Sequence, residues 1–173
     1  GWFLRQELLA PEVRPGHAFG ELVASDGRTL AALAQRYFGT DADDPRQLYI
    51  YERGPSGWEL VAEHLAEGER LIPSFVLVQS LAVAGDWIFA GVASSESGAV
   101  HVFHREASGW AQLDVLRPLL ATPAFGFTLA AEGDTLVVGA FLDGRDAPGG
   151  GSAHIYTLRG STWAAATILT PDD

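Results

Sequence analysis

Short apolar runs separated by polar turns recur along the chain with the period of β-strands. Residues 152–159 alternate, so that Ile155 and its second neighbours share one face and Tyr156 and its second neighbours share the other. Residues 135–140 form an apolar run, which is typical of a strand buried on both faces. Residues 30–38, rich in alanine and leucine, are interpreted as a strand because they align with two clearer strands, and no segment has a convincing helical period.

The pattern returns three times, each time with a tryptophan. Trp2, Trp58, Trp110 and Trp163 are separated by 56, 52 and 53 residues. Each of the last three follows another aromatic residue by seven positions, namely Tyr51, Phe103 and Tyr156. A period of about 50 residues indicates an array of small units, each of which buries its apolar face against its neighbours.

One repeat contains four expected strands. In the third repeat these are residues 110–120, 125–131, 135–140 and 152–159. Gly133 and Asp134 form a turn signal between the second and third, because glycine reaches positive φ without a steric penalty. Four short antiparallel strands per repeat are typical of a propeller blade.

The sequence therefore predicts an all-β fold, a β-propeller-type array of four-stranded antiparallel blades. Three blades are expected, at residues 1–57, 58–109 and 110–162. Residues 163–173 are interpreted as the first strand of a further blade or as a closing strand.

The third repeat carries a recognisable motif. Phe125-Gly126 is followed by the turn and apolar run described above, and then by the segment Gly-Ser-Ala-His-Ile-Tyr at 151–156. This order resembles the FG-GAP repeat, the blade unit of the integrin α-chain propeller and of many bacterial secreted or surface proteins. The first repeat keeps Phe19-Gly20, whereas Phe75 lacks its glycine in the second. The resemblance implies a binding module located outside the cytoplasm, whether secreted, periplasmic or on the cell surface.

The number of repeats raises the question of closure. Closed propellers contain about four to eight blades, and three blades leave apolar faces open. Two interpretations follow: the chain is a fragment of a longer polypeptide, or copies of it assemble to complete the ring. The first is preferred, because the sequence starts at a blade strand and contains no methionine.

Composition limits the partners. With 47% hydrophobic and 19% charged residues, the chain is globular rather than disordered. A net charge of −11 disfavours binding to nucleic acid and to anionic membranes. No apolar run reaches the roughly 18 residues of a membrane-spanning helix. The absence of cysteine excludes disulfides and thiol chemistry.

Two acidic loops are candidate calcium sites. They contain Asp41, Asp43 and Asp44 in the first repeat, and Asp143 and Asp146 in the third. Calcium prefers several oxygen ligands on a flexible loop, and some FG-GAP repeats bind it through an Asp-x-Asp-x-Asp-Gly loop. Both loops lack part of that pattern, and Arg145 adds a positive charge to the second. Solvent-exposed turn acids without a cofactor are therefore the preferred interpretation, with calcium binding as the alternative.

Several other positions recur between repeats. Gly91 and Gly139 are expected to let backbones approach closely. His101 and His154 occupy equivalent positions, which Tyr49 takes in the first repeat. Half-buried, hydrogen-bonded imidazoles are preferred there over a shared metal ion. The repeated aromatic residues are expected to form the seams between blades.

Catalytic signatures are missing from the sequence. It contains no nucleophile elbow, no His-Glu-x-x-His motif and no phosphate-binding glycine loop before a helix. Glu63, Glu67 and Glu69 are interpreted as an exposed connector rather than as a glycosidase pair.

The sequence therefore predicts a non-enzymatic binding or scaffold module that contacts a protein partner or a cell-surface ligand. Residues 35–47 and 141–151 form its expected binding rim. The alternatives are an accessory subunit of a large assembly, a homo-oligomer among them, and a carbohydrate-active propeller enzyme.

Overall fold

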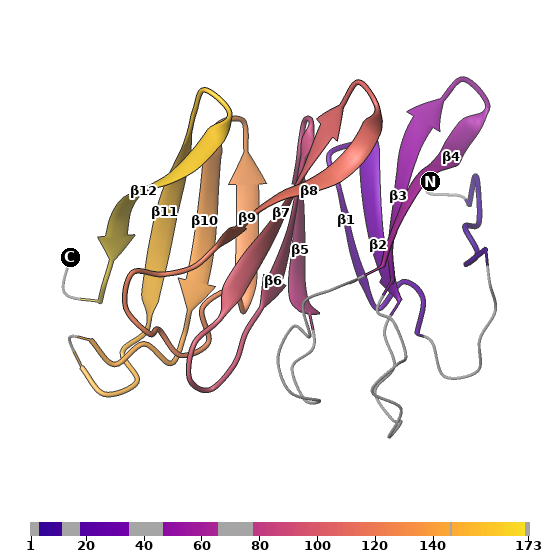
Figure 1. Ribbon diagram of the computed structural model, residues 1–173. Coiled ribbons are helices and arrows are strands. Elements are labelled where there is room, and N and C mark those ends of the chain that lie inside the picture. The colour runs from indigo at the N-terminus through magenta and orange to yellow at the C-terminus, as the bar shows by residue number, and fades with distance from the viewer. Residues whose placement is uncertain (1–3, 12–17, 35–46, 66–77, 146, 172–173) are drawn as a thin grey trace. The chain divides into compact units, whose positions relative to one another are not determined.

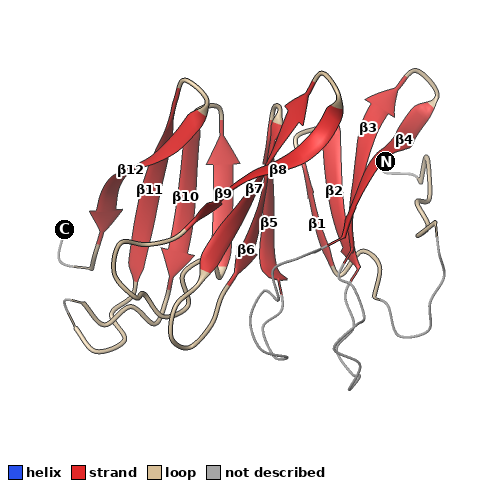
Figure 2. Ribbon diagram, in the orientation of Figure 1, coloured by secondary structure: helices blue, strands red, loops and turns tan. Residues whose placement is uncertain are grey.

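A computed structural model describes residues 4–11, 18–34, 47–65, 78–145 and 147–171 of the 173-residue chain. These residues form twelve β-strands, and no helix occurs among them (Figure 2). The strands make three four-stranded sheets, and every pairing within them is antiparallel. The predicted all-β class of a propeller-type blade array is therefore confirmed.

The chain divides into two compact units, residues 1–74 and 75–173. The first unit contains one sheet, with strands β1 (Leu22–Ser25), β2 (Thr29–Ala34), β3 (Gln47–Gly54) and β4 (Gly57–Leu65). The second contains a sheet of β5 (Val78–Ala84), β6 (Trp87–Val92), β7 (Ala99–Glu106) and β8 (Gly109–Leu116), and a sheet of β9 (Thr128–Glu132), β10 (Thr135–Ala140), β11 (Ser152–Arg159) and β12 (Thr162–Leu169). In each sheet the strands lie side by side in chain order (Figure 1).

The tryptophan-bearing strand is the last strand of its sheet, not the first strand of the next. In β8, Trp110 pairs with Arg105 of β7, and in β12, Trp163 pairs with Leu158 of β11. The reason is local, because a connection of two residues between β7 and β8 permits only a hairpin. Each of these sheets therefore ends with the tryptophan-bearing strand, which the expected units beginning at residues 58 and 110 had placed at the start of the next blade. The division into separate domains at 1–57, 58–109, 110–162 and 163–173 stays a prediction.

Within the third sheet the predicted strands 135–140 and 152–159 are confirmed as β10 and β11. The predicted strand at 125–131 is partly wrong, because Phe125-Gly126 lies in a turn before β9. Gly126 has a φ of 88°, which a strand does not accommodate, and the Phe127 N–H donates to the Ala124 carbonyl at 3.1 Å. The Gly133 turn between β9 and β10 has the expected positive φ, at 54°.

A single apolar core joins the two sheets of the second unit. It contains Ala82, Trp87, Phe89, Val100, Val102 and Leu116 from sheet β5–β8, Leu136, Val138, Ala140, Tyr156 and Trp163 from sheet β9–β12, and Phe125 from the turn before β9. The Trp163 ring packs edge-on against Trp87 and Phe89, with centroid distances of 5.6 and 5.0 Å. The expected role of the repeated aromatic residues in the seam between blades is thus confirmed for these two sheets.

The first unit has its own core on one face of sheet β1–β4. Ala32, Ala34, Tyr49 and Tyr51 are buried there, and Leu8, Phe19, Leu30 and Trp58 pack against them. Leu8 comes from the segment before β1, so residues of the chain outside the sheet help to cover this face.

Candidate functional site

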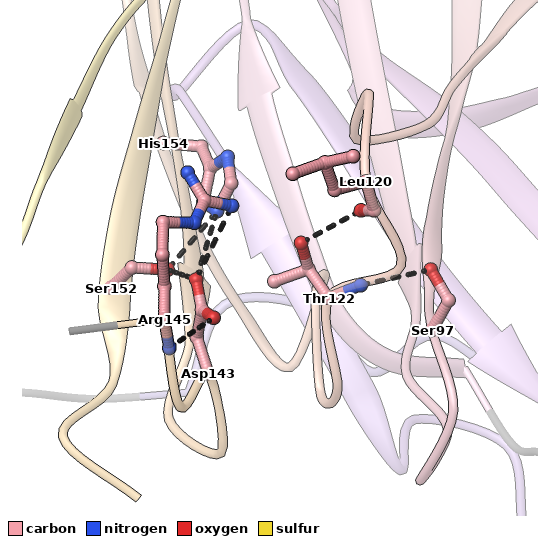
Figure 3. A network of polar contacts seen from close by, with 7 residues as sticks. All are labelled: Ser97, Leu120, Thr122, Asp143, Arg145, Ser152 and His154. Carbon is pink, nitrogen blue, oxygen red and sulfur yellow. Dashed lines mark hydrogen bonds and ion pairs between the residues drawn. The ribbon is translucent and has the colours of Figure 1, made fainter. Parts of the chain in front are cut away.

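A cluster of polar side chains lies where the loop between β10 and β11, residues 141–151, meets the sheet (Figure 3). Asp143 and Arg145 belong to this loop, whereas Ser152 and His154 lie two residues apart on one face of β11. The loop and the strand therefore bring together four polar side chains that the sequence separates by up to eleven positions.

Asp143 forms the centre of the cluster. It is only 5% exposed, and its Oδ2 accepts a hydrogen bond from Ser152 Oγ at 2.6 Å. Its Oδ1 accepts from the Arg145 backbone N–H at 3.2 Å, and the Arg145 guanidinium lies 3.6 Å from Oδ2. The Asp143 carbonyl accepts from the Gly151 N–H at 2.8 Å, which joins the two ends of the loop. The preferred interpretation of Asp143 as a solvent-exposed turn acid is therefore wrong, because this loop folds back and satisfies the carboxylate internally.

His154 completes the cluster on the inner side. It is 4% exposed, its ring packs edge-on against Phe125 at 5.0 Å, and its Nε2 lies 3.0 Å from Ser152 Oγ and 3.9 Å from Asp143 Oδ2. Burial lowers the pKa of His154 below its usual 6.5; Arg145 lowers it further and Asp143 partly opposes them. The imidazole is therefore neutral at neutral pH.

The hydrogen bonds of Ser152 define the direction of proton donation. A hydroxyl carries one proton, and the 2.6 Å contact assigns it to the Asp143 carboxylate. Nε2 of His154 therefore donates to Ser152 Oγ. In a Ser-His-Asp triad the imidazole accepts the serine proton and the carboxylate binds the other ring nitrogen. The order here is reversed, so the arrangement braces the loop and does not activate Ser152 as a nucleophile.

The equivalent slot of sheet β1–β4 contains a tyrosine. The Tyr49 hydroxyl donates to Gln47 Oε1 at 2.7 Å, and Gln47 Nε2 donates to Glu63 Oε2 at 3.3 Å. The Tyr49 ring meets Phe19 edge-on at 5.4 Å, as His154 meets Phe125. Glu63 therefore serves the polar network of this slot, and Glu67 and Glu69 lie outside the described residues.

The two equivalent histidines were expected to be half-buried, and the structure buries both almost completely. His101 is 3% exposed on β7 and His154 is 4% exposed on β11, where it is hydrogen-bonded. Among the residues that the structure describes, no group of three or more His, Cys, Asp or Glu side chains could hold a metal ion. Asp41, Asp43, Asp44 and Asp146 lie outside those residues, as does most of the expected rim at 35–47.

An exposed apolar cluster lies at the start of the braced loop. Two of its residues, Phe141 and Leu142, fall in the expected rim, but the apolar character of the cluster was not predicted. Phe127, just before β9, and Phe141, just after β10, are 41% and 53% exposed, and their rings are 4.6 Å apart. Leu142 follows, with 45% exposure. The sequence signal was the pair Phe141-Leu142 at the start of a loop rich in glycine and acidic residues, where apolar side chains are unexpected.

These sheets and their aromatic seam define a propeller-type blade array. Residues 120–156 match the family model of the FG-GAP repeat. The match runs from the segment before the Phe125-Gly126 turn into β11, and it confirms the resemblance for that part of the chain. No curated protein matched the chain. The described residues contain no helix long and apolar enough to cross a membrane.

Proposed function

We propose that the chain is a non-enzymatic binding module, located outside the cytoplasm, that contacts a protein or another cell-surface ligand through the loops of its sheets. The observation that carries the proposal is the exposed Phe127–Phe141 pair beside a loop whose position is fixed by a buried carboxylate. The FG-GAP repeat supports both parts of the proposal, since such repeats are typical of extracellular binding proteins.

The loop has the properties of a preformed contact surface. Aromatic residues are enriched at protein interfaces, where they supply large contact areas at low cost in side-chain entropy. Phe141 follows directly on β10, and Asp143 ties the loop to β11 through Ser152. A loop braced in this way loses little conformational freedom on binding, which favours affinity.

The test is the loss of binding when the apolar cluster is removed. We expect Phe141→Ser together with Leu142→Ser to weaken binding to intact cells of the source organism, or to their purified surface fraction, by at least about tenfold. Flow cytometry or biolayer interferometry measures this. Leu113→Ser is the matched control, because Leu113 is 47% exposed in β8, away from this loop. Binding that survives the double substitution would contradict the assignment of this loop.

The same assay addresses calcium. We infer that binding through the 141–151 loop needs no ion, since Asp143 is already satisfied by Ser152 and Arg145. A chelator should leave this binding unchanged. Chelator-sensitive binding that is lost in Asp41→Asn and Asp43→Asn would instead assign calcium to the first acidic loop.

A further inference from the structure

The seam between the two sheets of the second unit is made from two unlike faces. We call one the receiving face; on sheet β5–β8 it carries Ser80, Ala82, Phe89, Gly91, Val100, Val102 and Leu116. We call the other the inserting face; on sheet β9–β12 it carries the Phe125-Gly126 turn, Leu136, Val138, Tyr156 and Trp163. The inserting face packs on the receiving face, and the seam is thus directional.

The backbones fit closely at the centre of this seam. The Gly126 carbonyl accepts a hydrogen bond from Ser80 Oγ at 2.8 Å, and the Ala124 N–H donates to the Ser94 carbonyl at 2.8 Å. A side chain at Gly91 would overlap the Gly126 carbonyl. The expected close approach at Gly91 is therefore confirmed, and a glycine there marks a receiving face.

Next to this contact, the connection between β8 and β9 is joined to the loop between β6 and β7. The Thr122 N–H donates to Ser97 Oγ at 3.5 Å, and Thr122 Oγ1 donates to the Leu120 carbonyl at 2.9 Å (Figure 3). The Phe125-Gly126 turn and the segment before it are therefore held by hydrogen bonds from β5 and from the loop between β6 and β7.

Sheet β9–β12 repeats the receiving face on its other side. The strand registers equate Thr128, Ala130, Val137, Gly139, Ala153, Ile155 and Leu169 with the seven receiving residues in the order given above. Gly139 thus matches Gly91, and the Thr128 hydroxyl matches the Ser80 hydroxyl that holds the inserted turn.

This second receiving face is open in the described part of the unit. Phe89 and Val102 are 0% exposed, whereas their equivalents Val137 and Ile155 are only half-buried. Leu169 is 46% exposed, while its equivalent Leu116 is 6% exposed. No sheet formed by the described residues 78–171 packs on this side, and its apolar residues are thus available to an inserting face.

Sheet β1–β4 repeats the inserting face. The Gly20 N–H donates to the Leu33 carbonyl at 3.0 Å, as the Gly126 N–H donates to the Gly139 carbonyl at 3.1 Å. The φ angles of Gly20 and Gly126 are 79° and 88°. Phe19, Leu30, Ala32, Tyr51 and Trp58 take the places of Phe125, Leu136, Val138, Tyr156 and Trp163. This sheet therefore carries the complete pattern that a receiving face accepts.

A short segment takes the place of a blade on this inserting face. Leu8 packs against the cluster, and the Gln6 side chain pairs with the Trp58 backbone, accepting from its N–H at 2.8 Å and donating to its carbonyl at 3.0 Å. Leu8 is half-buried and Gln6 is exposed. Residues 4–10 therefore cover this face less completely than the buried aromatic residues Trp87 and Phe89 cover Trp163.

We propose that the inserting face of sheet β1–β4 in one copy docks on the open receiving face of sheet β9–β12 in a second copy, displacing residues 4–10. The seam within residues 75–173 shows the contact that would form, with Phe19-Gly20 on Gly139 and Trp58 over Val137. Because the two faces differ, the contact is head-to-tail, and it generates rings or open chains rather than a symmetric dimer.

A second copy is favoured as the occupant because this one chain presents both halves of a seam that it already forms internally. The net charge of −11 makes copies repel one another, while the two faces are mainly apolar. Salt screens the repulsion without weakening apolar contact, so association should increase with ionic strength.

The experiment measures the mass distribution of the full chain against concentration, by sedimentation velocity and native mass spectrometry. Wild type should form oligomers larger than a dimer as concentration and salt rise. Ile155→Arg on the receiving face and Trp58→Arg on the inserting face should each weaken association by at least about tenfold, because each buries an unpaired charge. Leu113→Arg, at the bulge of β8, should associate like wild type. Leu30→Glu replaces Trp58→Arg if circular dichroism shows the latter unfolded.

Mixing the two blocked variants distinguishes head-to-tail docking from any other association. Each variant retains one intact face, so an equimolar mixture should form a one-to-one dimer and nothing larger. Gln6→Ala should strengthen association of the wild-type faces, since it removes both hydrogen bonds of the cover. A wild-type chain that stays monomeric at high salt, or oligomers unchanged by Ile155→Arg, would overturn the proposal. Cell binding through Phe141 is measured separately and can succeed or fail on its own.

Discussion

Sheets β1–β4 and β9–β12 share a backbone pattern but differ in what covers them. In both, a glycine before the first strand donates its N–H to the second strand, and a phenylalanine meets the third strand edge-on, at 5.4 Å in the first sheet and 5.0 Å in the third. Yet Phe125 is fully buried under sheet β5–β8, while Phe19 is half-buried in the cluster that Leu8 also contacts. The repeat therefore specifies the blade, whereas its burial depends on a neighbour.

The polar slot on the third strand also differs between these sheets. Tyr49 and Gln47 fill it with neutral groups that reach Glu63, whereas His154 and Ser152 fill it around the buried Asp143. The same backbone position thus holds either a tyrosine hydroxyl that is linked through Gln47 to the exposed Glu63, or an imidazole beside a buried carboxylate. The repeat therefore preserves the shape of the blade at this slot, whereas the chemistry of the slot varies.

The largest expected contrast is between the two phenylalanines. Phe125→Ala should lower the free energy of unfolding by about 3–5 kcal/mol, because it leaves a cavity between two sheets. Phe19→Ala should cost about half as much, since Phe19 is partly exposed. Urea unfolding measures the loss of stability in both variants, and hydrogen exchange of peptides from each sheet shows which sheet is destabilised. Equal losses would show that the two aromatic contacts are equally buried in solution.

A glycine pair gives the next contrast. In Gly126→Ala, the alanine would have a left-handed φ and a Cβ 2.8 Å from the Ala99 carbonyl oxygen. We therefore expect the free energy of unfolding to fall by about 2–3 kcal/mol. In Gly20→Ala, the alanine would have the same kind of φ, but no atom lies within 4 Å of its Cβ. The free energy of unfolding should therefore fall by only about 1 kcal/mol. The same unfolding assay measures the difference. A Gly20 variant as unstable as the Gly126 variant would indicate that the receiving face of a partner already covers Phe19-Gly20.

The polar slots should respond less. Ser152→Ala removes a hydrogen bond to a buried carboxylate and should cost about 2 kcal/mol. Tyr49→Phe removes a neutral hydrogen bond to Gln47 and should cost about 1 kcal/mol. Hydrogen exchange of the Gly151 amide, which donates to Asp143, should accelerate only in the Ser152 variant. Unchanged exchange there would contradict the bracing of the loop by Ser152.

Much of the fold could be predicted from the sequence because hydrophobic period and turn residues act locally. The bounds of β10 and β11 and the turn at Gly133 follow from such signals. The seam role of the aromatic residues followed from their recurrence. The strand at Trp110 was assigned to the wrong sheet because the period of a repeat does not show where each unit begins. Only the short connection before Gly109 shows that this strand pairs with β7.

The candidate site was less predictable. The burial of Asp143 depends on the loop returning to β11, a long-range contact that no local pattern records. Its acidic neighbours favoured a solvent-exposed interpretation, although Ser152 and His154 were two residues apart on one strand face. The match of inserting and receiving faces likewise needed the strand registers, because Gly91 and Gly139 gain meaning only beside Gly126.

The smallest expected effect is a pH-dependent loss of stability in sheet β9–β12, which has His154 in the slot, but not in sheet β1–β4, which has Tyr49 there. Burial, aided by Arg145, holds the pKa of His154 below 6.5, so the unfolded chain binds the proton more readily than the folded one. The stability from neutral His154 is therefore complete above pH 6.5 and is lost as the pH falls from 6.5 through the lower folded-state pKa. Hydrogen exchange of β10 and β11 at about pH 7.5 and 5.5 should show this loss, and His154→Gln should reduce it. Sheet β1–β4, with Tyr49 in the slot, serves as the internal control; an equal pH response in both sheets would assign the effect to surface charge rather than to His154.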